Sequence, residues 1–336
     1  MIRLGIVVPC YNEEETLPQT AHVLTDLITR LSASRKIAPE SKVFFVDDGS
    51  HDATWKMIEA LTKSHPQIAG IKLSRNVGHQ SALLAGLLRS DGDVLVSMDA
   101  DLQDDVSVVD SMLTEYAAGK TIVYGVRRHR DTDSLFKRAT AQLFYRLLRM
   151  MGARIIDNHA DFRLMGRAAI EALRQFEETN LFLRGMIPLL GFPSSIVYYD
   201  RSARTAGESK YPLGRMIALA LDGITSFSVV PLRLIFFVGF VVFLFSAAMG
   251  IWVLLAALFN DMTIPGWAST TLPIYFLGGV QILCIGVLGE YAGKIYREVK
   301  RRPRYIVEKS VGAKVSSQMR VPSETHPDNL AESDRS

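Results

Sequence analysis

Short apolar runs alternate with amphipathic stretches along the N-terminal part of the chain. Each run is rich in β-branched residues and ends in a polar turn, which is typical of a buried strand; the runs are RLGIVVP, KVFFVDD, IAGIKLS, DVLVSMD and TIVYGVR. The stretches between them have helical periodicity, at residues 14–31, 53–63, 80–88 and 106–117. This alternation predicts an α/β fold in which helices cover a parallel sheet. Ligands of such sheets bind beyond the carboxyl ends of the strands.

Two stretches without charged residues, 234–259 and 262–289, follow in the C-terminal part of the chain. Both exceed the roughly 18 apolar residues that mark a membrane-spanning helix. We therefore predict that residues 233–293 contain two transmembrane helices, at about 234–259 and 269–290; two buried helices of a soluble core are the alternative. Lys and Arg are absent between the stretches and frequent outside them. This charge pattern predicts an integral protein of the inner (cytoplasmic) membrane with both termini in the cytoplasm.

The same pattern sets the expected domain limits. Residues 1–212 form a cytoplasmic α/β domain, and residues 213–232 form an amphipathic helix along the membrane interface. Residues 294–310 are a basic segment beside the membrane, and residues 311–336 are a disordered tail. The net charge of +3 is too small to indicate nucleic-acid binding, whereas basic residues beside a membrane suit anionic lipid headgroups.

Carboxylates collect where three of the predicted strands end, in the sequences PCYNEEE, VDDGSHD and DADLQDD. Carboxylates this close repel one another unless a cation or backbone donors offset the repulsion. The carboxyl ends of parallel strands share one edge of the sheet, which would bring together Glu13, Asp47, Asp48, Asp99 and Asp101. Such a crevice suits a divalent cation and a ribose or base, although a single D-x-D is equally typical of an ordinary turn. No G-x-G-x-x-G follows the first strand, and Asn12 with Glu15 predicts a helix cap there instead.

A series of motifs follows in order: VVPCYNEEETLP, VDDGSHDAT, SRNVGHQSALLAGL, DADLQDD, DFRLM, NLFLRGM and RTAGESKYP. The series resembles family 2 glycosyltransferases, and within them the polyprenyl-phosphate glycosyltransferases. Bactoprenol glucosyltransferases are most similar, with dolichyl-phosphate mannose synthases and the undecaprenyl-phosphate aminoarabinose transferase as more distant relatives. The resemblance covers residues 3–307. It implies a GT-A (Rossmann-like) catalytic domain that uses a nucleotide sugar and Mg²⁺ or Mn²⁺, and it suggests a homotetramer.

Carried over position by position, the resemblance assigns roles to the strand ends. Asp101 and Gln103, together with Asp99, would ligate the metal, and Asp99 would also face the donor sugar. Arg204 would close over the donor diphosphate from a Gly-containing loop, although such a loop could instead face lipid headgroups. The residues expected at the nucleotide are Pro9, Tyr11, Glu13, Asp48, Asp99, Arg204 and Lys210.

The acceptor implied by the resemblance is a polyprenyl phosphate. By analogy with phosphorylated side chains, its second pKa should be about 6, so the phosphate is mostly ionised at neutral pH. It therefore needs positive charge to bind it more than a base to deprotonate it. Arg127 and Arg138 are expected to clamp this phosphate, because guanidinium binds phosphate through two hydrogen bonds; a solvated basic helix face is the alternative. Asp161 completes the expected catalytic set with Asp99 and Arg204, either as a base or, as we expect, by positioning an Arg or the substrate.

Two residues near these positions receive no ligand role. Asp105 stands where relatives often have proline, and His79 is expected to cap or pack a helix because no second His lies at ligand spacing.

The expected reaction is an inverting transfer of glucose from UDP-glucose to undecaprenyl phosphate at the cytoplasmic membrane face, as in O-antigen modification of the cell envelope. Another sugar, such as mannose, aminoarabinose, N-acetylglucosamine or galactose, is the first alternative. A processive polysaccharide synthase is disfavoured because no Q-x-x-R-W motif occurs. A non-enzymatic membrane scaffold on a transferase-like domain is the remaining alternative, and it predicts damaged metal ligands.

Overall fold

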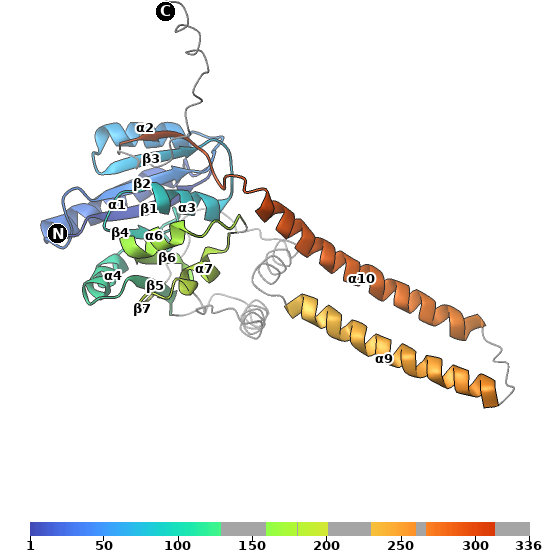
Figure 1. Ribbon diagram of the computed structural model, residues 1–336. Coiled ribbons are helices and arrows are strands. Elements are labelled where there is room, and N and C mark those ends of the chain that lie inside the picture. Colours follow the sequence, from blue (N-terminus) through green and yellow to red (C-terminus); the bar gives the residue numbers. More distant parts are fainter. Residues whose placement is uncertain (129–158, 180, 201–229, 260–266, 313–336) are drawn as a thin grey trace, which may run out of the picture.

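The structure is a computed structural model, and it describes residues 1–128, 159–179, 181–200, 230–259 and 267–312 (Figure 1). Three residues with expected roles lie outside these ranges: Arg138, Arg204 and Lys210. Most of the expected interfacial helix and most of the expected tail lie outside them as well.

The five predicted strands and the four predicted helices of the N-terminal part are confirmed, with helix limits that differ by a few residues. In chain order they are β1 (Leu4–Cys10), α1 (Leu17–Ala33), β2 (Lys42–Asp47), α2 (Thr54–Ser64), β3 (Ile68–Leu73), α3 (His79–Arg89), β4 (Val94–Ser97), α4 (Val108–Ala117) and β5 (Ile122–Arg127). The remaining elements are β6 (His159–Gly166), α6 (Arg167–Arg174), α7 (Leu183–Leu189), β7 (Ser194–Tyr199), α9 (Val230–Phe259), α10 (Trp267–Val299) and β8 (Val307–Val311).

One mixed sheet joins all the strands, in the order β7-β5-β6-β4-β1-β2-β3-β8. The prediction of a parallel sheet is correct for the five predicted strands, and β7, which the sequence did not predict, is also parallel to β5. Strand β6 runs antiparallel to β4 and β5, and β8 runs antiparallel to β3. Strand β6 escaped prediction because Asp161 and Arg163 interrupt its apolar run. Since β6 runs in the opposite direction, its first residues lie at the edge where the parallel strands end.

Apolar side chains fill both faces of the sheet. Along β1, Ile6 and Val8 join one buried cluster with residues of α1, α2 and α4, whereas Val7 joins a second cluster with residues of α3, α6 and α7. Adjacent strand residues point to opposite faces, so a strand that is buried throughout needs this cover on both sides. Gly86 of α3 lies so close to β1 that an added Cβ would stand 2.3 Å from a methyl group of Val7.

Helices α9 and α10 lie side by side and extend away from the sheet (Figure 1). Among the described residues, one segment is long and apolar enough to cross a membrane by length and composition, the 24 residues Phe276–Val299 of α10. The sequence predicted two such spans. The first of them, which forms α9, stays a prediction as a membrane span.

Strand β8 corrects the predicted domain limits. It pairs with β3 at the edge of the sheet, with Lys72 opposite Lys309, and its side chains form ion pairs with neighbouring elements: Lys72–Glu308 at 2.8 Å and Lys309–Glu59 at 2.5 Å. Residues 307–311, expected beside the membrane or in a tail, therefore belong to the α/β domain. The charged side chains that concealed this strand in the sequence are those of an exposed edge strand.

Candidate functional site

The loops after β1 and β2 are tied together by side-chain hydrogen bonds. The backbone N–H of Asn12 donates to Ser50 Oγ at 3.0 Å, and Asn12 Oδ1 accepts from the N–H of His51 at 2.9 Å. The N–H of Glu13 donates to Thr54 Oγ1 at 2.9 Å. Asn12 has a positive φ of 54°, a conformation that Asn tolerates better than most residues. The predicted cap is therefore wrong: Asn12 links two loops instead of capping α1, which begins at Leu17.

Asp48 secures the loop before α3. Its two carboxylate oxygens accept hydrogen bonds from the backbone N–H groups of Val77 at 2.8 Å and Gly78 at 3.0 Å. Burial raises the pKa of Asp48, and these two hydrogen bonds oppose the shift. Of the other residues expected at the nucleotide, Pro9 is buried in β1 and Tyr11 is exposed, with its ring edge-on to His51.

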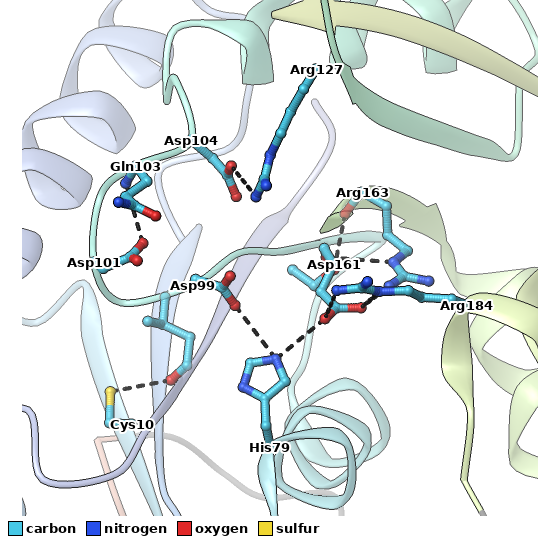
Figure 2. A network of polar contacts seen from close by, with 12 residues as sticks. Cys10, His79, Asp99, Asp101, Gln103, Asp104, Arg127, Asp161, Arg163 and Arg184 are labelled. Carbon is cyan, nitrogen blue, oxygen red and sulfur yellow. Dashed lines mark hydrogen bonds and ion pairs between the residues drawn. The ribbon is translucent and has the colours of Figure 1, made fainter. Parts of the chain in front are cut away.

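His79, the first residue of α3, stands between two carboxylates (Figure 2). Its Nε2 lies 3.4 Å from Asp99 Oδ1 and 3.5 Å from Asp161 Oδ2. Burial alone would lower the pKa of His79, but the hydrogen bond to Asp161 and the charge of Asp99 raise it. His79 begins α3 but makes no side-chain cap, and its ring also contacts the two carboxylates; the expectation that it binds no metal stays a prediction. Helix α3 must first bring its N-terminus to the sheet edge before the ring can meet both carboxylates, and no local sequence pattern predicts that.

Asp161 is held by two arginines as well as by His79. Arg163 Nη2 donates to Oδ1 at 2.6 Å, while Arg184 donates to Oδ2 through Nη2 at 3.1 Å and to Oδ1 through Nε at 3.3 Å. Burial would raise the pKa of Asp161, but the hydrogen bond to His79 and the charges of Arg184 and Arg163 hold it well below its usual range. A carboxylate held ionised in this way is a poor proton acceptor, which favours a positioning role over that of a base.

The DADLQDD loop distributes its carboxylates among different partners. Asp101 Oδ1 accepts from the N–H of Gln103 at 3.3 Å, and Asp105 Oδ1 accepts from the N–H of Ser107 at 2.9 Å, just before α4. Asp104 is buried and turns toward β5 and β7. Asp101, Asp104 and Asp105 thus each have their own donor, whereas burial and the charges of Asp104 and Asp101 still raise the pKa of Asp99.

A second network joins Asp104, Tyr199 and Arg127. Tyr199 Oη donates to Asp104 Oδ1 at 2.5 Å and accepts from Arg127 Nε at 3.2 Å, while Arg127 Nη2 lies 3.4 Å from the same Asp104 oxygen. Arg127 and Tyr199 are register partners at the ends of the parallel strands β5 and β7. Burial and the Asp104 charge raise the pKa of Tyr199. The expected phosphate clamp Arg127 therefore has its side chain fixed by two residues at this edge.

Sequence reasoning missed four residues of these networks. Arg163 and Arg184 lie in the motifs DFRLM and NLFLRGM, and the sequence alone gives them no role. Asp104 is one carboxylate of an acidic cluster, and no local pattern marks Tyr199. The motifs DFRLM and NLFLRGM are the sequence signal that could have found the two arginines. Arg163 lies two residues after Asp161 in the chain, and Arg184 contacts Asp161 in space.

The side chains around Asp99 show whether a divalent cation could bind there. Asp99 Oδ1 is buried and, among the described residues, accepts no hydrogen bond; its neighbour is His79 Nε2 at 3.4 Å. Burial raises the pKa of this carboxyl to about 6, against the opposing charge of His79. A buried oxygen of this kind fits a hard cation, which binds carboxylate oxygens. Across the described ranges, no three His, Cys, Asp or Glu side chains are grouped so as to hold a metal by themselves. A metal here would need the amide of Gln103 or substrate oxygens as further ligands.

Comparisons with known proteins identify the family. The sequence model described as glycosyl transferase family 2 matches residues 5–174. The uncharacterized glycosyltransferase YkoT of Bacillus subtilis (strain 168) is 50% identical over 307 residues, which cover 91% of this chain and 91% of that protein. The bactoprenol glucosyl transferase of Shigella phage SfII is 39% identical over 311 residues, covering 92% and 98%. Among solved structures, mannosyl-3-phosphoglycerate synthase from Rubrobacter xylanophilus covers 66% of this chain and 71% of its own, at 16% identity and a TM-score of 0.42. The family model and the two sequence relatives show that the chain, with its GT-A-like mixed sheet, belongs to glycosyltransferase family 2 and is a glycosyltransferase.

Proposed function

We propose that the protein transfers a hexose, with inversion, from a nucleotide sugar to a polyprenyl phosphate at the cytoplasmic face of the membrane. Glucose from UDP-glucose and undecaprenyl phosphate are the expected substrates. The observation that carries this proposal is the similarity to a bactoprenol glucosyl transferase along 92% of the chain, which includes helices α9 and α10 as well as the α/β domain.

The donor side of the proposal rests on the edge where β1, β2 and β4 end. Tyr11, Glu13 and Asp99 lie on loops that follow β1 and β4, and hydrogen bonds join the loop after β1 to the residues that follow β2. Asp101, Gln103 and Asp99 would hold Mg²⁺ or Mn²⁺, which would stabilise the negative charge of the leaving diphosphate. The buried Oδ1 of Asp99 supports this assignment.

The acceptor side rests on Arg127 and on the group around Asp161. An ionised phosphate can attack the anomeric carbon without first losing a proton, so the protein has to bind and orient it. Arg127, at the end of β5, is the described residue proposed to bind the phosphate. Asp161 orients Arg184 and His79 beside Asp99, and its low pKa keeps it negatively charged while it does so.

The membrane location rests on helices α9 and α10. Large apolar side chains are exposed along both helices, including Phe236, Phe240, Trp252, Ile274, Ile282 and Ile285. An apolar surface of this extent indicates contact with lipid or another protein, and the span Phe276–Val299 is long enough for a bilayer. In the proposed arrangement both helices cross the membrane, and the α/β domain meets the lipid-borne phosphate at its surface.

The test is a transfer assay with the full chain reconstituted in lipid vesicles that contain undecaprenyl phosphate. Radiolabelled UDP-glucose, UDP-galactose, UDP-N-acetylglucosamine and GDP-mannose are supplied one at a time, and the lipid fraction is then extracted. We expect label in the lipid from UDP-glucose, loss of transfer in EDTA, and recovery with Mg²⁺ or Mn²⁺. Asp101→Asn should abolish transfer, whereas Asp91→Asn, a change at an exposed carboxylate that precedes β4 and so lies at the opposite edge of the sheet from the site, should not.

Label that enters lipid from another sugar would correct the donor and leave the reaction class intact. The absence of a lipid-linked product from every donor would contradict the proposed transfer. Full activity after chelation would contradict the proposed metal.

A further inference from the structure

The last turn of α10 is fastened to the α/β domain. Both carboxylate oxygens of Glu298 accept from the backbone N–H of Thr179, at 3.0 and 2.9 Å. A few residues further on, Arg304 Nη1 donates to the carbonyl oxygen of Phe176 at 2.6 Å. The short segment between α6 and α7 is therefore held from two points on the chain that leaves the helical pair.

That segment leads directly into the site. Leu183, the first residue of α7, donates its N–H to Gln80 Oε1 at 2.9 Å, and Gln80 follows His79 in α3. The next residue of α7, Arg184, binds Asp161. Only a few residues thus separate the end of a membrane-spanning candidate from the side chains around Asp99 and Asp161.

Two features of its surroundings oppose the negative charge of Glu298. It lies in the last turn of α10, where the helix dipole disfavours a negative charge. It also lies near Glu178, whose pKa is raised by burial and by the Glu298 charge. The Thr179 N–H and the nearby positive charge of Arg304 offset these costs, so docking of the helix end on the segment stabilises the carboxylate.

We propose that Glu298 is a positioning residue that fixes the α9–α10 pair on the catalytic domain, so that an acceptor embedded in the bilayer is presented to the site. The inference rests on the proposed function, because it concerns the delivery of a membrane-borne acceptor. It goes beyond that function in assigning the delivery to one contact between Glu298 and the Thr179 backbone. An acceptor that reaches the site from water does not need this contact.

The test compares two acceptors in the full-length protein. One is undecaprenyl phosphate in vesicles, and the other is geranyl phosphate, which is short enough to be supplied from solution. For Glu298→Ala we expect kcat/KM with undecaprenyl phosphate to fall about tenfold, while kcat/KM with geranyl phosphate and KM for the donor change by less than about twofold. Glu298→Gln keeps an oxygen that accepts from Thr179 and should stay within about threefold of wild type on both acceptors. Asp91→Ala, at an exposed carboxylate outside the helical pair, is the control and should change neither.

An activity-independent measurement accompanies the kinetics. Hydrogen exchange at the Thr179 amide should be slow in the wild type and in Glu298→Gln and faster in Glu298→Ala. Equal losses on both acceptors, no loss on either, or unchanged exchange at Thr179 would each overturn the inference. A wild-type protein that glycosylates neither acceptor would overturn the proposed function and this inference with it, whereas normal lipid transfer by Glu298→Ala would overturn the inference alone.

Discussion

The two halves of the candidate site are held together by different kinds of contact. At the ends of β1 and β2, the loops are joined by hydrogen bonds between side chains and backbone groups, as at Asn12 and Ser50. At the ends of β4 and β5 and the start of β6, buried charged side chains are joined to one another, as at Asp161 and Arg163. Loss of one hydrogen bond of the first kind should lower the free energy of unfolding only modestly. The second leaves an uncompensated buried charge whenever one member is removed, so the two halves should respond very differently to substitution.

The largest effect is expected at Asp161. Asp161→Ala would leave the fully buried Arg163 and the guanidinium of Arg184 without their carboxylate, which should lower the free energy of unfolding by about 3 to 5 kcal/mol. Sugar transfer should fall at least about 100-fold, because Arg184 and His79 lose their orientation. Urea unfolding and initial rates measure the two effects.

Asp91→Ala provides the control for Asp161. Asp91 pairs with Arg3 at the surface, with 63% of its side chain exposed, so its loss should cost at most about 1 kcal/mol. Equal destabilisation by the two substitutions would contradict the idea that a buried charged pair costs more to break than an exposed one. Asp161→Asn tests the role further: transfer at the wild-type rate would show that the negative charge is not needed.

A smaller effect is expected in the Arg127 network. Tyr199→Phe removes the hydroxyl that Arg127 Nε and Asp104 share, and it should raise KM for the polyprenyl phosphate about fivefold, because the guanidinium is then held less firmly. The free energy of unfolding should fall by about 1 to 3 kcal/mol, since Asp104 loses a buried donor. Steady-state kinetics with varied acceptor measure the first effect, and KM for the donor should not change.

Tyr198→Phe is the matched control, because the neighbouring Tyr198 is 53% exposed. A similar rise in KM for both variants would mean that the edge of β7, and not the Tyr199 hydroxyl, supports Arg127.

A still smaller effect is expected in the loops that follow β1 and β2. Asn12→Ala loses the hydrogen bond from His51 and places alanine at a φ of 54°, which should lower the free energy of unfolding by about 1 to 2 kcal/mol and weaken UDP binding. Asn12→Gly loses the same hydrogen bond, but glycine adopts a positive φ without strain. Its loss of unfolding free energy should therefore be about half that of Asn12→Ala. Urea unfolding and calorimetric titration with UDP measure both. If glycine were worse than alanine, the backbone explanation would be wrong.

The smallest effect is a pH dependence at Asp52. Burial would raise its pKa, but hydrogen bonds from Thr54 and Glu14 hold the folded-state pKa below the usual 3.8. A lowered folded-state pKa contributes stability above pH 3.8 that is lost as the pH falls through the folded-state value. Asp52→Asn should therefore be less stable than the wild type near neutral pH, and the difference should shrink below pH 3.8. A constant difference from neutral to acidic pH would exclude the carboxylate as its source.

The sequence identified some members of both halves and overlooked others, for a consistent reason. The loops with Asn12, Asp48 and Asp99 follow apolar strands, and that local pattern was enough to locate them. The arginines that hold Asp161, and the tyrosine that holds Arg127, come from β6, α7 and β7, which have no simple apolar pattern. The family motifs included Arg163 and Arg184, but motif membership alone does not say which side chain faces which carboxylate.

By itself, the sequence determined the five strands and four helices of the N-terminal part, the shared edge where their acidic loops meet, and the family, because local periodicity and contiguous motifs carry that information. Only the tertiary structure decided that β6 and β8 run antiparallel, that His79 stands between Asp99 and Asp161, and that Glu298 reaches Thr179. These contacts join residues far apart in the chain, and their partners are chosen by the packing of the whole sheet.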